Sequence, residues 1–560
     1  IIAEANATTV VEPEWLAVVS PKNSLLLERT RARSRAAAVG TSVDPVMLEI
    51  FNNLYMSIAE QMGLRLQNTA SSVNIKERLD FSCALFDASG NLIANAPHMP
   101  VHLGSMGESI KTVIRLNAGK MKPGDVFVLN APYNGGTHLP DVTVITPVFG
   151  SSNEILFYVG SRGHHADIGG ISPGSMPPAS KVVEEEGVLI DNFLLVERGR
   201  FREKETVALL QSGRYPVRNA AQNIADLRAQ VAANEKGVQE LRRMVAHFGL
   251  DAVRAYMRHV QDNAEESVRR VLGVLNDGSF RLPMDNGASI DVKIAIGGDR
   301  RSARIDFRGT SPQLPNNFNA PAAVAMAAVL YVFRTLVDDD IPLNSGCLKP
   351  LEVLIEEGSM LRPRYPAAVV AGNVETSQCV TDALYGALGV LAASQGTMNN
   401  FTFGNERYQY YETVAGGSGA GPGFDGADVV QTHMTNSRLT DPEVLEWRYP
   451  VRLEGFEIRQ GSGGAGRWHG GNGAIRRLRF LEPMSAAILS GHRTVRPHGM
   501  AGGQPAEPGR NYVLRADGSR TELGPFDETR VAAGDVFVIE TPGGGGYGPR
   551  QGQYNTQRDK

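Results

Sequence analysis

Cysteine is scarce in this sequence: of 560 residues only Cys83, Cys347 and Cys379 carry a thiol. They are widely spaced and form no Cys-x-x-Cys pair, so we expect neither a disulfide framework nor a thiolate metal site. Sparse, unpaired cysteine is typical of the reducing cytoplasm, and we expect a cytoplasmic protein. Neither Cys347 nor Cys379 has a base beside it in the sequence, so both thiols are predicted to be buried rather than nucleophilic.

Long apolar runs and a strong excess of one charge are also missing. The best candidate for a membrane span, residues 322–333, falls short of the roughly 18 residues required and predicts a buried helix instead. The N-terminus has neither a signal-peptide pattern nor a Met, so we expect a chain that begins inside a longer polypeptide. The net charge is −4, and the one basic run, at residues 29–35, is short. We therefore expect neither a membrane nor a nucleic acid as a partner.

Several common catalytic motifs are absent or incomplete. The sequence has no Gly-x-x-x-x-Gly-Lys-Ser/Thr phosphate loop, so we expect no nucleotide site of that kind. Residues 170–174 match Gly-x-Ser-x-Gly, but the serine is followed by Pro173, which has no N–H for an oxyanion hole. The glycine run at 543–546 lacks a following helix and predicts a loop, and residues 184–186, three glutamates, predict a solvated surface run.

What the sequence does contain is enough apolar material for a large core, with 42% hydrophobic residues. Asp44 and Pro45 predict the N-cap and first residue of a helix. Residues 142–148 and 155–159 predict a strand pair, and residues 205–275 predict helices. Towards the C-terminus the chain becomes glycine-rich with short strand-like runs. We predict an α+β protein, a large multi-lobed mixed fold with a central helical segment and a glycine-rich β lobe at the C-terminal end.

The predicted divisions follow these changes of pattern. Residues 1–28 are too few for a core of their own and predict the tail of a preceding domain, followed by a linker at 29–43. Residues 44–550 predict one catalytic region, followed by a C-terminal tail at 551–560. Within that region we expect an α/β lobe at 44–200, helices at 201–285, a second α/β lobe at 286–410 and the glycine-rich β lobe at 411–550.

Histidines and aspartates bracket the predicted strand pair. His138 and Asp141 precede the first strand, and His164, His165 and Asp167 follow the second. Antiparallel neighbours lie about 5 Å apart, so a hairpin brings His138, Asp141 and one of the adjacent histidines to one point. Two imidazoles and a carboxylate, with a position left for water, form a common catalytic metal site. Spacing alone leaves two questions open: whether the ligand is His164 or His165, and whether these are merely hydrogen-bonded loop residues.

Three further segments, at residues 344–347, 372–377 and 432–436, are polar within apolar surroundings and predict loops. Buried polar groups need partners, and either the loop backbone or a substrate with a carboxylate and an amide supplies them. On the second interpretation, the predicted substrate-binding residues are Asn373, Glu375, Thr376, His433 and Asn436.

Several of these segments resemble motifs of the hydantoinase B family. They are Gly135-Gly136-Thr137-His138-Leu139-Pro140-Asp141, Ser161-Arg162-Gly163-His164-His165-Ala166-Asp167-Ile168-Gly169-Gly170, residues 372–378 and Thr432-His433-Met434-Thr435-Asn436. The resemblance covers about residues 44–550 and is closest to the 5-oxoprolinase branch, especially over residues 164–178. Residues 2–13 resemble the end of the hydantoinase A half, the ATP-using partner that precedes the B half in fused members.

The resemblance implies a hydrolase that acts on a cyclic amide. In the 5-oxoprolinase branch the A half phosphorylates the lactam oxygen of 5-oxo-L-proline with ATP and magnesium. The B half then adds water and opens the ring, giving L-glutamate with ADP and phosphate as co-products. For this chain it implies a divalent metal (zinc, manganese or iron) held by His138, Asp141 and His164. Asp167 and His165 are then expected to be catalytic, Asp167 by orienting a ligand.

Other functions within and outside the family stay open. A hydantoinase B or an acetone or acetophenone carboxylase-type subunit would share these motifs and act on a hydantoin or a ketone. A scaffold for an ATPase partner would need no converging ligands, which argues against it. The expected partners are an A-type half or subunit, which uses the ATP and magnesium, and a small cyclic amide. A hetero- or homo-oligomer is expected.

Overall fold

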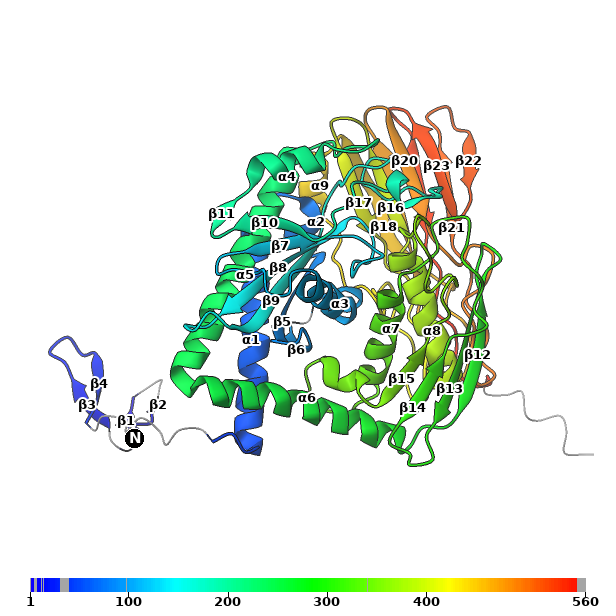
Figure 1. The fold of residues 1–560 in the computed structure, drawn as a ribbon. Coiled ribbons are helices and arrows are strands. Elements are labelled where there is room, and N and C mark those ends of the chain that lie inside the picture. Colours follow the sequence, from blue (N-terminus) through cyan, green and yellow to red (C-terminus); the bar gives the residue numbers. More distant parts are fainter. Residues whose placement is uncertain are drawn as a thin grey trace, which may run out of the picture.

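The computed structural model of this protein describes residues 2–4, 8–11, 13, 15–30, 40–96, 98–339 and 341–550. Most of the predicted linker at 29–43, and the whole predicted tail at 551–560, lie outside these residues. Helices and open sheets mix along the described chain (Figure 1), so the predicted α+β class is confirmed. Among the described helices, none is both long and apolar enough to span a bilayer. The individual lobe boundaries remain predictions.

A seven-stranded antiparallel sheet forms the first part of the body, in the order β11-β10-β7-β8-β9-β5-β6. Its strands are Phe81–Asp87 (β5), Leu92–Asn95 (β6), Val126–Leu129 (β7), Asp141–Phe149 (β8), Ile155–His164 (β9), Phe193–Glu197 (β10) and Arg200–Phe201 (β11). Every residue of β8 is buried, because helices cover both faces of the sheet. Cys83 and Leu85 of β5 pack into one apolar cluster, whereas their neighbours Ala84 and Phe86 pack into another.

Six α-helices belong to this first part: Pro45–Thr69 (α1), Val73–Lys76 (α2), Pro100–Leu116 (α3), Glu203–Leu210 (α4), Ala220–Phe248 (α5) and Leu250–Leu272 (α6). α1 and α5 cover one face of the sheet and α3 covers the other (Figure 1). As predicted, α1 begins with Pro45, and the Asp44 side chain accepts a hydrogen bond from Met47 N. Gly249, with φ of 84°, ends α5 and lets α6 leave in a new direction.

A second sheet, in the order β12-β13-β14-β15, is covered by two helices. Its strands are Gly278–Pro283 (β12), Ser289–Ile296 (β13), Ala303–Asp306 (β14) and Leu351–Leu354 (β15); the helices are Ala322–Thr335 (α7) and Ser377–Leu388 (α8). Pro321 is the N-cap of α7. Short helical turns at Val183–Glu185 (η1), Ser345–Leu348 (η2) and Gly372–Thr376 (η3) complete the helical elements here, the last of them a π-helix.

The C-terminal part is almost entirely β structure, as predicted. One sheet has the order β17-β16-β20-β23 and the other β18-β19-β24-β21-β22. Aromatic and aliphatic side chains from the two sheets share one core, which includes Phe401, Phe403 and Phe537. The elements are Asn400–Gly404 (β16), Gln409–Thr413 (β17), Pro442–Arg448 (α9), Val451–Arg459 (β18), Gly473–Phe480 (β19), Met484–Leu489 (β20), Arg510–Leu514 (β21), Arg520–Leu523 (β22), Phe526–Val531 (β23) and Val536–Glu540 (β24).

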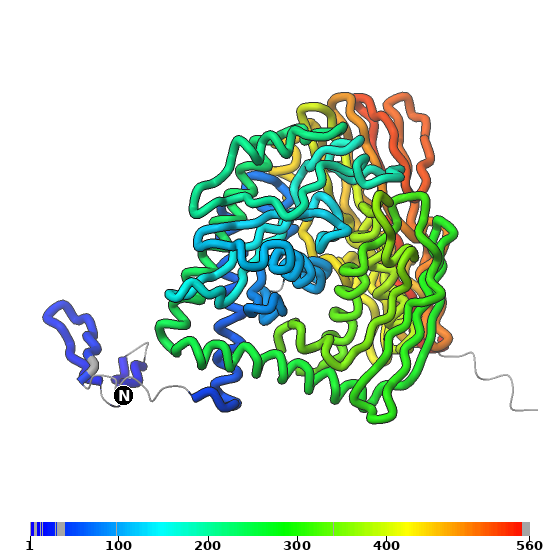
Figure 2. The backbone as a smooth tube through the Cα atoms, in the orientation of Figure 1, coloured from blue at the N-terminus to red at the C-terminus, as the bar shows by residue number. Residues whose placement is uncertain are grey.

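Segments far apart in the sequence meet where these parts join. The backbone tube in Figure 2 carries residues near 80–165 in blue and cyan beside residues near 370–435 in green and yellow. Hydrogen bonds cross this junction, for example from Arg78 to the carbonyl oxygen of Tyr411. Two small hairpins precede α1: Ile2–Ala3 (β1) with Thr8–Thr9 (β2), and Trp15–Val19 (β3) with Leu25–Arg29 (β4). The junction, not the hairpins, holds the predicted site.

Candidate metal centre

The β8–β9 hairpin brings the predicted ligands together. Asp141, the first residue of β8, is paired with His164, the last residue of β9. β9 continues beyond the predicted end at residue 159, because Ile155–His164 also pairs with β5 on its other side. His164 is therefore a residue at the end of a central strand, and its position is set by two neighbouring strands.

Two glycines turn the loop before β8 so that His138 faces Asp141. Gly135 has φ of 93°, a conformation that other residues rarely adopt. A Cβ atom on Gly136 would lie 2.2 Å from Asn130 O, so only glycine fits there. The Ser109 hydroxyl of α3 donates to the Gly135 carbonyl oxygen and fixes this loop on the helix. His138 is completely buried as a result.

Both histidines present an unprotonated Nε2 to the same place. His138 Nδ1 lies 3.3 Å from Val370 O, and His164 Nδ1 lies 3.0 Å from His165 O. A carbonyl oxygen can only accept, so each Nδ1 carries the hydrogen and each Nε2 keeps its lone pair. Asn74 Nδ2 also lies 3.1 Å from His164 Nδ1; turning this side-chain amide over places its accepting oxygen there instead. Both Nε2 atoms are buried and accept no hydrogen bond.

These orphaned nitrogens and the Asp141 carboxylate suit a metal ion. One atom from each of His138, Asp141 and His164 lies within 4.8 Å of the other two, and no other group in the described chain meets this condition. His138 Nε2 is 3.3 Å from Asp141 Oδ2. Burial, with nearby His138, holds the pKa of His164 well below its usual range. A neutral imidazole is the form that binds a metal.

Asp141 is held by three further side chains. His102 Nε2 donates to Oδ1 at 3.0 Å, whereas Thr137 Oγ1 and Asn373 Nδ2 donate to Oδ2 at 3.0 and 2.9 Å. Burial alone would raise the pKa of Asp141, but the overall effect of its surroundings, in which His102 lowers the pKa most, holds it well below the usual range. The carboxylate stays charged, as a ligand must.

A small cavity of about 20 Å³ opens beside Asp141 and His164, with room for about one water molecule. Asp80 lines it, and burial raises the pKa of this carboxyl despite the nearby Arg78 guanidinium. Tyr411 also lines it, with its ring stacked on His164 at a centroid distance of 4.6 Å. The other lining residues are Met99, Val101, His102, Asp141, His164, Asn373, Val374, Met398, Thr413, Met434 and Thr435.

The two residues predicted to be catalytic point away from this cavity. His165 Nε2 donates to Gln230 Oε1 on α5 at 3.1 Å. Asp167 pairs with Arg218 at 2.8 Å and accepts the backbone N–H groups of residues 169, 174 and 218. The structure does not bring either side chain to the three ligands. Their contacts hold the segment after β9 in place, and their catalytic roles stay predictions without a contact to support them.

Of the five predicted substrate-binding residues, only Asn373 lines the cavity. Glu375 lies behind it, where Oε1 accepts from Met398 N and Asn400 Nδ2; burial raises the Glu375 pKa to about 7. Thr376 donates to Phe318 O, and His433 donates to Asp382. Asn436 is exposed and donates to His98 O. Met434 and Thr435, from the predicted segment at 432–436, do reach the cavity.

Two local predictions are corrected. Residues 372–376 form a π-helix rather than a loop, because the backbone N–H groups of residues 374–376 all bond to Ala371 O. Glu186 is fully buried rather than solvated. Its carboxylate accepts the backbone N–H groups of Val369 and Val370 and the Ser180 hydroxyl. Three consecutive glutamates do not indicate these partners in the sequence, because Val369 and Val370 lie far along the chain and Ser180 lies in a loop. The three thiols are buried, as predicted for Cys347 and Cys379.

Sequence reasoning missed His102, Asp80 and Tyr411. His102 belongs to a stretch with five histidines, and its place three residues into a helix was the one available signal. Asp80 and Tyr411 belong to no motif in the sequence. Only the pairing of β5 with β9 and the position of β17 bring them to the cavity.

Comparison with known proteins shows which sequences and folds this chain resembles. The sequence profile described as hydantoinase B/oxoprolinase matches residues 44–550. The chain is 47% identical to 5-oxoprolinase 1 of Arabidopsis thaliana over 98% of its own length, but it spans only 45% of that relative. The structure of an ATP-dependent caprolactamase from Pseudomonas jessenii superimposes with a TM-score of 0.81 at 26% identity, covering 91% of this chain and 92% of that one. An acetone carboxylase has the same fold, with a TM-score of 0.82 at 17% identity, over 90% of this chain and 76% of that one.

Proposed function

Since the chain belongs to the hydantoinase B/oxoprolinase family, we propose that it is the ring-opening half of an ATP-dependent 5-oxoprolinase. Its substrate is 5-oxo-L-proline after phosphorylation of the lactam oxygen by an A-type half or subunit, which uses the ATP and magnesium. The products are L-glutamate, ADP and phosphate. The similarity to a caprolactamase, at 26% identity, favours a lactam over a ketone, because the acetone carboxylase shares the fold at only 17%.

The observation that carries the proposal is the pair of unprotonated Nε2 atoms beside a charged carboxylate. His138, Asp141 and His164 would hold a divalent zinc, manganese or iron ion. When bound, such an ion polarises a carbonyl group and lowers the pKa of water. His102 and Asn373 hold the carboxylate in place, and the Val370 and His165 carbonyls hold the imidazoles.

Asp80 is proposed as the group that takes a proton from the attacking water. Its carboxyl lines the same cavity, and burial raises its pKa above the usual value, which makes the carboxylate a stronger base. Water adds to the activated carbon, Asp80 accepts a proton, and the ring C–N bond breaks as nitrogen is protonated. Hydrolysis of the remaining acyl phosphate releases phosphate and L-glutamate.

The cavity must widen to admit a lactam, because about 20 Å³ holds only a water molecule. Its walls come from two separate parts of the chain, the hairpin side and residues 373–374 and 434–435. We propose that these walls separate as substrate enters and close again to exclude bulk water.

The test is glutamate release from 5-oxoproline with ATP and an added A-type half, together with the metal content of the chain. His138→Ala should lose the metal and nearly all glutamate release, whereas the exposed control His469→Ala should keep both. Unchanged turnover in His138→Ala would contradict the metal site. Carboxylation of a ketone or opening of a hydantoin, without glutamate release, would replace the proposed substrate. If the A-type half alone releases glutamate at the full rate, this chain is not catalytic and serves as a scaffold.

A further inference from the structure

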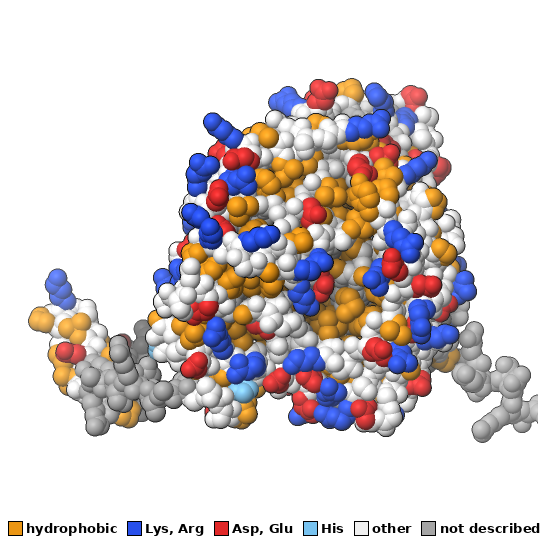
Figure 3. Space-filling model, in the orientation of Figure 1, with side chains coloured by type: hydrophobic (Ala, Val, Ile, Leu, Met, Phe, Trp, Pro, Cys, Tyr) orange, Lys and Arg blue, Asp and Glu red, His pale blue; other side chains and the backbone are white. Residues whose placement is uncertain are grey.

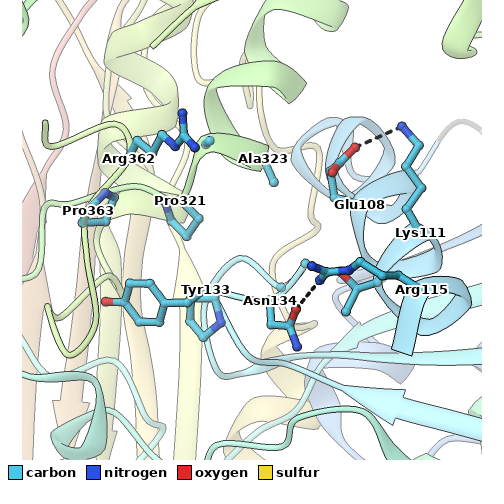
Figure 4. Close-up of a pocket in the computed structure, with 14 residues that line it drawn as sticks. Glu108, Lys111, Arg115, Tyr133, Asn134, Pro321, Ala323, Arg362 and Pro363 are labelled. Atoms are coloured by element: carbon cyan, nitrogen blue, oxygen red, sulfur yellow. Dashed lines mark hydrogen bonds and ion pairs between the residues drawn. The ribbon is translucent and has the colours of Figure 1, made fainter. Parts of the chain in front are cut away.

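An open pocket of about 530 Å³ lies just outside the loop that leads to His138 (Figure 4). Three parts of the fold form its walls: α3, residues 132–136, and the start of α7 with residues 362–363. Its volume is within the range of small-molecule sites. Gly135 and Gly136 line it, so it contacts the same loop that positions His138. On this face of the molecule, apolar and basic side chains gather between α3 and α7 (Figure 3).

The pocket carries more positive than negative charge. Lys111, Arg115 and Arg362 line it, against one carboxylate, Glu108. Glu108 pairs with Lys111 at 3.1 Å. Arg115 donates to the neutral amide oxygen of Asn134 at 2.8 Å, and no carboxylate among the described residues pairs with it. Arg115 and Arg362 face the pocket from opposite sides (Figure 4).

Arg362 is the least engaged of these cations. Its backbone is bonded to residues 358 and 359, but its side chain makes no hydrogen bond or ion pair within the described chain. An exposed guanidinium without a partner is ready to bind an anion through two parallel N–H groups. The start of α7 adds to the positive potential here, because Pro321 offers no side-chain cap to the first amides of that helix.

The small cavity of about 20 Å³ beside Asp141 and His164, by contrast, has no cationic side chain in the described part of its lining. None of the described residues that line it is lysine or arginine. The nearby Arg78 is buried and already bonded to Tyr411 O, Thr413 Oγ1 and Ser437 Oγ. Cations that match the charges of a phosphate line the outer pocket and not the cavity beside Asp141 and His164.

We propose that this pocket is a phosphate-binding site, with Arg115 and Arg362 as the principal ligands of a phosphate dianion. The charged side chains that line the pocket indicate that it binds an anion. Which phosphate it binds is inferred from the proposed function. Two sources share that chemistry: the phosphorylated lactam before ring opening, and the free phosphate released after it.

Inorganic phosphate is the probe for the site itself. Titration calorimetry on the 560-residue chain, without ATP or a partner, should detect phosphate binding that is weakened by about tenfold or more in Arg115→Ala and in Arg362→Ala. Arg281→Ala is the matched control, because Arg281 is an exposed arginine on β12 outside the pocket. Thermal unfolding should be unchanged in all three. Two outcomes would overturn the site: no phosphate binding by the wild-type chain, or phosphate binding as tight in both pocket variants as in the wild-type chain.

Turnover with the A-type half separates the two sources. If the site receives the activated lactam, the pocket variants should release more phosphate than glutamate, since intermediate is lost to water. If it holds the product, they should release phosphate and glutamate in equal amounts, with inhibition by phosphate reduced by about tenfold. If the wild-type chain binds phosphate but neither it nor the variants release glutamate, the phosphate site is supported and the proposed function is rejected. Equal coupling and equal phosphate inhibition in variants and wild type would reject the role of the site in the reaction.

Discussion

Asp141 and His164 are the final residue pair of the β8–β9 ladder, and paired residues project their side chains from the same face of a sheet. The carboxylate and one imidazole are thus placed together by backbone pairing before any side-chain contact is considered. A slip of one residue in this register would send one of them to the opposite face. The pairing of β5 with β9 opposes such a slip from the other side.

The adjacent histidines should respond differently to substitution. His164→Ala removes an Nε2 that faces Asp141 and should lower divalent-metal affinity on the order of 100-fold. His165→Ala removes a contact to Gln230 and should leave metal affinity within about twofold while lowering stability by about 1 kcal/mol. Metal titration and urea unfolding of the two variants measure both effects. Equal metal loss in both would mean that His165 also serves as a ligand.

Asp80→Asn should separate proton transfer from metal binding. The amide keeps the shape of the carboxyl group but cannot accept a proton, so kcat should fall by about 10² to 10⁴. Metal content should not change, because Asp80 is outside the group of three ligands. Single-turnover glutamate release and metal analysis on the same preparation check this. A variant with full kcat would exclude Asp80 as the base.

Gly136→Ala should destabilise the loop that presents His138. The added Cβ would meet Asn130 O at 2.2 Å, so the backbone must shift, at a cost of about 1–3 kcal/mol. Gly298→Ala is the control, because a Cβ there meets nothing within 4 Å. Urea unfolding measures the difference, and metal affinity should fall together with stability only at Gly136. Equal midpoints for the two variants would contradict the close approach.

Glu186 should make stability depend on pH. Burial raises its pKa from 4.5 to about 7, so the folded chain holds a proton that the unfolded chain has released between these values. Its contribution therefore falls as pH rises from about 4.5 to 7, by up to about 3 kcal/mol. Glu186→Gln should reduce this slope in unfolding free energy measured across that range. Glu375, with a similarly raised pKa, should give a second slope that persists in the variant.

The sequence predicted the parts of this protein whose cause is local. Asp44 and Pro45 start α1 because capping and a fixed φ act within one turn. The strand-like runs at residues 142–148 and 155–159 predicted the hairpin, and hence the meeting of His138 and Asp141 with one of the two adjacent histidines. The choice of His164 over His165 came from family resemblance, not from spacing.

What the sequence could not predict depends on contacts between distant segments. Asn373 reaches Asp141 only because the π-helix lies against the end of β8. Glu186 is buried only because residues 369–370 pass over it. His433 and Glu375 have the polar character expected of substrate ligands, but each finds its partners behind the cavity. Side-chain type shows that a group needs a partner, and the tertiary fold decides which one.

The hydrogen bonds that close the metal centre join residues 232 positions apart, His138 to Val370 and Asp141 to Asn373. During synthesis all three ligands leave the ribosome long before the carbonyl and amide that orient them. A nascent chain ending near residue 200 therefore lacks the carbonyl that orients His138 and the amide of Asn373 that helps to hold Asp141. The ion proposed for this site would accordingly be selected late, only after residues 370–373 have folded against the hairpin.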